Sequence, residues 1–147
     1  MAKERRALRA LVAAVAAGVA AAAAPSVQDA AAHSAMVLLL ITVTAPGFAR
    51  RMAGEQGVVQ ALLRAVAAGG AAAPLRPQAA AVSSLVVLRA FSEAGPDIPR
   101  RVAEEPGALA TLVAGLADGG AAAVPSVPQG FIGRSAIGML ANMATAY

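Results

Sequence analysis

The fold is decided by a stretch of sequence that occurs twice. Residues 96–125 read PDIPRRVAEEPGALATLVAGLADGGAAAVP, and residues 46–75 read PGFARRMAGEQGVVQALLRAVAAGGAAAPL. A shift of about fifty residues keeps charges, glycines and apolar positions in step, which predicts a structural repeat. The aligned positions are Pro46 with Pro96, Arg50–Arg51 with Arg100–Arg101, Ala53 with Ala103, Glu55 with Glu105, Gly57 with Gly107, Leu62 with Leu112, and Gly69–Gly70 with Gly119–Gly120.

The N-terminal part of the chain overlays the same unit. ALRALVAAVAAG at 7–18 aligns with ALATLVAGLADG at 108–119, so Leu8 falls on Leu109 and Val15 on Leu116. The first helix is therefore expected to belong to a repeat that begins part-way through. We predict one domain that comprises a partial repeat at 1–45 and two full repeats, at 46–95 and at 96–147.

The same N-terminal stretch supports an alternative. Residues 1–25 have a basic start, an apolar run and small residues before Pro25, which is the outline of a targeting segment. In this alternative the protein is an organelle-targeted or membrane-associated helical protein from which 1–25 are cleaved. A membrane span is not expected, because the strongest apolar run, residues 35–45, is shorter than the roughly twenty residues that a bilayer requires.

Composition favours closely packed helices. Alanine is abundant, is the best helix former and buries little area, and no stretch alternates apolar and polar residues as a strand does. The absence of cysteine excludes disulfides and thiolate sites. Twelve basic residues stand against eight acidic ones, and no aromatic residues interleave with the arginines, so nucleic-acid binding is not expected.

The periodicity of apolar residues and the positions of proline and glycine predict a short, a medium and a long helix in each full repeat. Ser26 and Ser126 have the spacing of N-caps, and the glycine pairs at 69–70 and 119–120 read as helix stops. The run at 36–43 is apolar nearly all round, so both of its faces are expected to be covered. The predicted helices are 3–17, 26–44, 46–53, 57–68, 78–93, 96–102, 107–117 and 129–146.

Three segments resemble the armadillo family and, less specifically, the related HEAT repeats. ARRMAGEQGVVQALLRAV (49–66) and PRRVAEEPGALATLVAGL (99–116) are similar to the family's passage from its first to its second helix. AIGMLANMA (136–144) is similar to its third-helix pattern, with Asn142 on the asparagine position. The resemblance implies an all-α, right-handed α-solenoid of three-helix repeats. It also implies a non-enzymatic scaffold that binds other proteins within a larger assembly, in an intracellular setting that is cytoplasmic, cytoskeletal or ciliary.

Departures from the family pattern concern ligand binding. In peptide-binding members, third-helix asparagines hold the ligand backbone and nearby tryptophans form side-chain pockets. Leu40 and Ala90 stand at the positions equivalent to Asn142, and the tryptophan positions carry Met36, Val86 and Gly138. Recognition of a linear peptide by an asparagine ladder is therefore not expected.

The sequence offers no set of residues for catalysis. His33 is the single histidine, and neither a nucleophile nor companion metal ligands can be named for it. No glycine-rich loop carries a lysine, so a phosphate site is unsupported. We expect no enzyme activity, no cofactor, no metal and no small-molecule substrate.

The strongest interaction signal is the recurrence of paired arginines. Arg50, Arg51, Arg100 and Arg101 would form a basic stripe suited to acidic segments of a partner protein. The competing interpretation is a solvated face in which arginines pair with glutamates four residues later, as in Arg51–Glu55, Arg100–Glu104 and Arg101–Glu105. Asn142 is a further candidate contact. The apolar ends of the solenoid are expected to be covered by another subunit or by further repeats.

Overall fold

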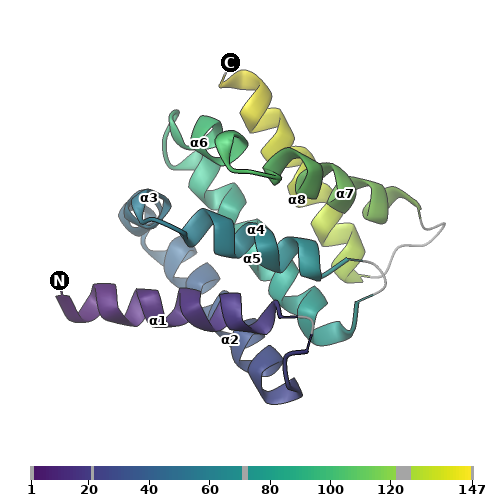
Figure 1. Ribbon diagram of the computed structural model, residues 1–147. Helices are drawn as coiled ribbons and strands as arrows, with labels where there is room; N and C mark the ends of the chain where they lie inside the picture. The colour runs from purple at the N-terminus through teal and green to yellow at the C-terminus, as the bar shows by residue number, and fades with distance from the viewer. Residues whose placement is uncertain (1, 21, 71–72, 122–126, 147) are drawn as a thin grey trace.

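The protein is all-helical, as the sequence predicts. The computed structural model describes residues 2–20, 22–70, 73–121 and 127–146, and these contain no strand. Figure 1 shows the helices formed by the described residues, which from α3 onward recur in the order short, medium, long. They are α1 (Ala2–Gly18), α2 (Pro25–Thr44), α3 (Pro46–Gly54), α4 (Val58–Ala68), α5 (Leu75–Glu93), α6 (Ile98–Glu104), α7 (Ala108–Ala121) and α8 (Val127–Thr145).

The helices pack in two layers. The long helices α2, α5 and α8 form one layer, in which α5 contacts both α2 and α8 (Figure 1). The medium helices α1, α4 and α7 form the other, and each of them packs on the long helix that follows it in the chain. Within that second layer, α4 contacts both α1 and α7. The short helices α3 and α6 each precede a medium helix, and both contact α5.

The core lies between the two layers and is built mainly from aliphatic side chains. Burying each of these side chains stabilises the fold by about 1.5–3 kcal/mol before the entropy cost of ordering it. The large side chains with less than 2% of their surface exposed are Phe91, Leu38, Met52, Leu62, Leu85, Leu88, Ile98, Leu112, Met139, Val15, Val87 and Val102.

The turn between a short and a medium helix has the same geometry in both copies. Gly57 and Gly107 each have a φ of 79°, and they are the described residues with positive φ. Glu55 N–H donates to Met52 O and Ala61 N–H to Gly57 O; fifty residues on, Glu105 N–H donates to Val102 O and Thr111 N–H to Gly107 O. The aligned glycines therefore mark a turn that requires a left-handed backbone conformation.

The approach of a medium helix to its long helix also recurs. A Cβ on Gly18 would lie 2.2 Å from the Cβ of Ala31, and a Cβ on Gly69 would lie 2.2 Å from the Cβ of Ala81. Gly18 aligns with Gly69, and Ala31 with Ala81. Glycine is therefore needed at these two positions because another helix lies against them, which is a separate requirement from ending a helix.

Several predicted boundaries are corrected by the structure. Ser26 does not cap α2, because the helix starts one residue earlier at Pro25 and its N-cap, Ala24, makes no side-chain hydrogen bond. Gly119 and Gly120 do not stop α7, which continues to Ala121; a glycine inside a helix costs only about 1 kcal/mol relative to alanine. The expected cap at Ser126 lies outside the described residues.

Helix α2 differs most from its prediction. Only one face of its apolar run is covered, and the residues exposed on the other are Met36, Val37, Leu40 and Val43. Helix α2 packs mainly on α1 and α5, and the described elements leave the side chains on its opposite face exposed. At twenty residues, α2 is also long and apolar enough to cross a membrane by length and composition, a property that the core helix of a soluble protein can share.

Candidate protein-binding surfaces

The paired arginines all lie on the outside of the short helices. In α3 the apolar residues Phe48, Ala49 and Met52 are buried, and in α6 the buried residues are Ile98, Pro99 and Val102. This spacing turns the two intervening positions of each helix outward. Arg50, Arg51, Arg100 and Arg101 are accordingly all exposed.

The two arginine pairs lie on one side of the molecule. Helices α3 and α6 are both at that side in Figure 1, and both contact α5. Arg50 also reaches toward α6, because a Cβ on Gly95, in the turn before α6, would lie 3.8 Å from Arg50 Nε. We refer to Arg50, Arg51, Arg100 and Arg101 as the arginine edge.

Two of the expected intrahelical ion pairs are not formed. Within the described part of the chain, Arg51 does not pair with Glu55, nor Arg101 with Glu105. Glu55 and Glu105 follow the last residue of α3 and α6 in extended conformations, with ψ of 134° and 133°. Their side chains therefore leave the helical path on which i,i+4 pairing depends.

Glu55 is held by a different helix. Its carboxylate oxygens lie 3.3 Å from Arg5 Nε and 3.7 Å from Arg9 Nη2, both on α1. The two arginine side chains are 71% and 75% exposed, so these ion pairs contribute little to stability. They nevertheless place two cationic groups above the turn between α3 and α4.

Asn142 faces a neighbouring helix. Its Nδ2 donates a hydrogen bond of 2.7 Å to Ser92 Oγ on α5, and the residue is half-buried. At the two equivalent positions, Leu40 is exposed and Ala90 is half-buried. The structure thus gives the Asn142 amide a partner within the chain, between two long helices.

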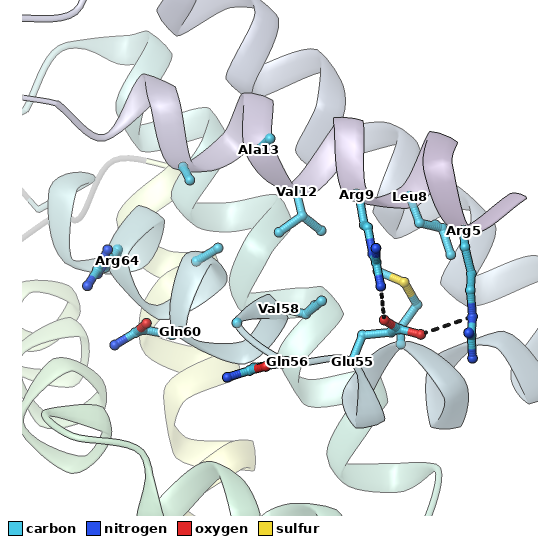
Figure 2. Close-up of a pocket in the computed structure, with 14 residues that line it drawn as sticks. Arg5, Leu8, Arg9, Val12, Ala13, Glu55, Gln56, Val58, Gln60 and Arg64 are labelled. Atoms are coloured by element: carbon cyan, nitrogen blue, oxygen red, sulfur yellow. Dashed lines mark ion pairs between the residues drawn. The ribbon is translucent and has the colours of Figure 1, made fainter. Parts of the chain in front are cut away.

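A groove between α1 and α4 was not predicted from the sequence. Figure 2 shows it, with α1 along one wall and α4 along the other, and its volume is about 450 Å³. Its apolar lining includes Leu8, Val12, Val58 and Ala61, and its polar lining consists of Arg5, Arg9, Glu55, Gln56, Gln60 and Arg64. We refer to this feature as the α1–α4 groove.

Both ends of the helical array expose apolar side chains at positions where the aligned residues of another repeat are buried. Leu109, Val113 and Ile137 are 51–54% exposed. The aligned residues of the preceding repeat, Val59, Leu63 and Leu85, are 7%, 4% and 0% exposed. At the opposite end Val37 is 39% exposed, whereas its aligned residues Val87 and Met139 are fully buried. Each end therefore presents a face that is covered at the corresponding place inside the array.

Side chains that could bind a metal ion or act in catalysis are few among the described residues. No group of three or more His, Asp or Glu residues that could hold a metal ion occurs among the residues that the structure describes. His33 is exposed, and its Nδ1 makes a 2.7 Å hydrogen bond to the backbone carbonyl of Asp29 in the same helix. That hydrogen bond belongs to the helix surface and assembles no reactive group.

Comparison of the chain with protein-family models, with curated proteins and with solved structures finds no match.

Proposed function

We propose that the protein is a non-enzymatic, armadillo-like scaffold that binds other proteins within a larger assembly. The proposed architecture is a right-handed α-solenoid of three-helix repeats. Three observations support it: the repeated turn at Gly57 and Gly107, the repeated close approach at Gly18 and Gly69, and the two layers of helices. Solenoid repeats bury their apolar faces against neighbouring repeats, and these layers do the same.

The observation that carries the proposal is the difference in burial between equivalent positions. Leu85 is fully buried where the next long helix covers it, and the aligned Ile137 is 54% exposed. An apolar face of this kind is a site of interaction in a soluble protein. We therefore propose that another subunit or further repeats cover both ends.

The arginine edge is the proposed contact for acidic segments of a partner. Its four side chains are exposed, and within the described residues Arg50, Arg51 and Arg101 form no ion pair. At these three arginines, a partner's carboxylates would meet a charge that no ion pair with a described residue occupies. A cytoplasmic, cytoskeletal or ciliary assembly is the proposed setting, with neither nucleic acid nor membrane as a partner.

Charge reversal along the arginine edge tests this function. We expect the variant with all four arginines changed to glutamate to retain fewer partner proteins than the wild type in affinity purification from a native extract. The reason is that the introduced glutamates repel the acidic segments of a partner. Helicity measured by circular dichroism should be unchanged, since all four side chains are exposed. The matched control changes the same residues to lysine, which keeps the charge. Equal retention by the glutamate variant would refute the proposed contact.

A second candidate function is that of an organelle-targeted or membrane-associated protein that loses residues 1–25. The observation that favours it is α2, which is long and apolar enough to cross a membrane and exposes Leu40 and Val43. Against it, Val15 of α1 is 1% exposed within the core. N-terminal sequencing of the native protein separates the two candidates, since a start at residue 26 would support cleavage.

A further inference from the structure

We propose that the α1–α4 groove is a docking site for an acidic amphipathic helix of a partner protein. This inference rests on the proposed scaffold function and names the chemistry of one partner. The site differs from the arginine edge, with which it shares no residue. Two properties of the groove carry the inference: its apolar lining and the excess of positive charge along it.

The apolar lining is incompletely covered in the isolated chain. Leu8 and Val12 of α1 line the groove and are half-buried. The aligned residues of α4, Val59 and Leu63, are 7% and 4% exposed. The same positions are therefore covered in one repeat and accessible in the preceding one. A volume of about 450 Å³ accommodates a few aliphatic side chains of a helix lying along the groove.

The charge of the groove selects the polar groups of the ligand. Arg5, Arg9 and Arg64 supply three positive charges against the single negative charge of Glu55, which leaves an excess of two. Glu55 interacts with Arg5 and Arg9, whereas Arg64 forms no ion pair with any described residue. Carboxylates that flank an apolar face complement this pattern, and lysines would oppose it.

The positions of the arginines set the spacing of those carboxylates. Figure 2 shows Arg64 at one end of the groove and Arg5 and Arg9 at the other. Along the chain, Glu55, which pairs with Arg5 and Arg9, lies just before Gly57, the N-cap residue of α4. Arg64 lies two helical turns after Gly57, which corresponds to about 10 Å along the helix axis. A ligand helix with carboxylates about two turns apart would reach both ends, with leucine-like side chains between them in the groove.

The probe for this site is a fluorescein-labelled amphipathic peptide of about four helical turns, with leucines along one face and glutamates beside them. Fluorescence anisotropy would measure its binding to the full chain. We expect saturable binding that weakens with added salt, and no binding of the same peptide with lysines in place of the glutamates. Wild-type protein that fails to bind the glutamate peptide, or binds the lysine peptide equally well, would overturn the proposal.

Paired variants locate the binding. Arg64→Glu should weaken it by about tenfold or more, because it places a negative charge opposite the glutamates, and Ala13→Trp should weaken it by filling the groove. The controls on α1, Arg6→Glu and Ala10→Trp, change exposed residues outside the groove and should leave affinity within about twofold. Equal effects of test and control variants would refute the site. The far-ultraviolet spectrum of each variant should match the wild type.

Two further results separate this proposal from its alternatives. If the chain binds phosphatidylserine vesicles through the groove and not the peptide, the site is a lipid contact and the proposal is wrong. Loss of peptide binding in the variant with all four arginine-edge residues changed to glutamate, with binding intact in Arg64→Glu, would place the peptide on the arginine edge instead. A failed peptide assay leaves the scaffold function to its own test, because that test changes different residues.

Discussion

At the scale of single residues, the backbone conformation of two glycines separates them from their neighbours. Gly57 and Gly107 have a φ of 79°, and a Cβ at either position would meet no atom within 4 Å. A substitution there therefore tests conformation alone. We expect Gly57→Ala and Gly107→Ala each to lower the free energy of unfolding by about 1–2 kcal/mol, because an L-residue is strained in the left-handed region. Urea denaturation followed by circular dichroism measures the change.

Gly54 supplies the matched control for that prediction. A Cβ on Gly54 likewise meets nothing within 4 Å, but its φ is not positive and the residue lies in α3. Gly54→Ala should therefore leave stability unchanged or raise it by up to about 1 kcal/mol. A similar loss at Gly54 and Gly57 would show that the left-handed turn is not what requires glycine.

At the scale of the elements, the contact between α1 and α2 and that between α4 and α5 use the same pair of small residues. Gly18→Ala should destabilise the protein by about 1–3 kcal/mol, because the new Cβ would lie 2.2 Å from the Cβ of Ala31. Adding Ala31→Gly should recover much of that loss, since the other atoms near this Cβ are at 3.5 Å or farther. Thermal denaturation of the single and double variants measures the recovery.

The equivalent pair in the next repeat should respond differently. A Cβ on Gly69 would meet both Ala81 Cβ at 2.2 Å and the backbone oxygen of Pro77 at 2.6 Å. Removing the Ala81 methyl group relieves only the first contact, and a backbone atom cannot move aside like a flexible side chain. Ala81→Gly should thus fail to restore Gly69→Ala. Full recovery there would mean that α4 and α5 can shift apart without cost.

The sequence predicts the helices well because their signals are local. Apolar periodicity, prolines and the aligned glycines place most helix boundaries within three residues of those observed. The two glycine pairs differ in outcome: Gly69 follows the last residue of α4, whereas α7 continues through Gly119 and Gly120. A glycine permits a helix to end but does not force it to, so its neighbours decide the outcome.

Local sequence likewise predicts one of the surfaces and does not predict the other. Exposure of the arginine edge follows from the helical spacing of Arg50 and Arg51 beside buried apolar residues, which the sequence shows directly. The ion pairs of Glu55 could not be predicted, because they join it to Arg5 and Arg9, about fifty residues earlier in the chain. The α1–α4 groove is also formed by two helices that are distant in sequence, and local periodicity carries no information about such a contact.

At the scale of the whole molecule, the decisive comparison is between Leu85 and Ile137, which occupy aligned positions on α5 and α8. Leu85 is fully buried and Ile137 is 54% exposed. Leu85→Ala should lower the free energy of unfolding by about 2–5 kcal/mol, because it opens a cavity in the core. Ile137→Ala should change the stability of dilute monomer by about 0.5 kcal/mol or less, since its side chain is partly in water. Urea denaturation at low protein concentration compares the two.

Protein concentration then distinguishes a bare end from a covered one. If another copy of the chain covers the exposed face of α7 and α8, sedimentation velocity should show self-association that Ile137→Ala weakens, and the difference in stability between Ile137→Ala and wild type should grow with concentration. If further repeats or a different subunit cover it, the chain should remain monomeric and the difference should stay constant. A loss at Ile137 as large as that at Leu85 in dilute solution would contradict both outcomes, because it would mean that the folded monomer already buries this face.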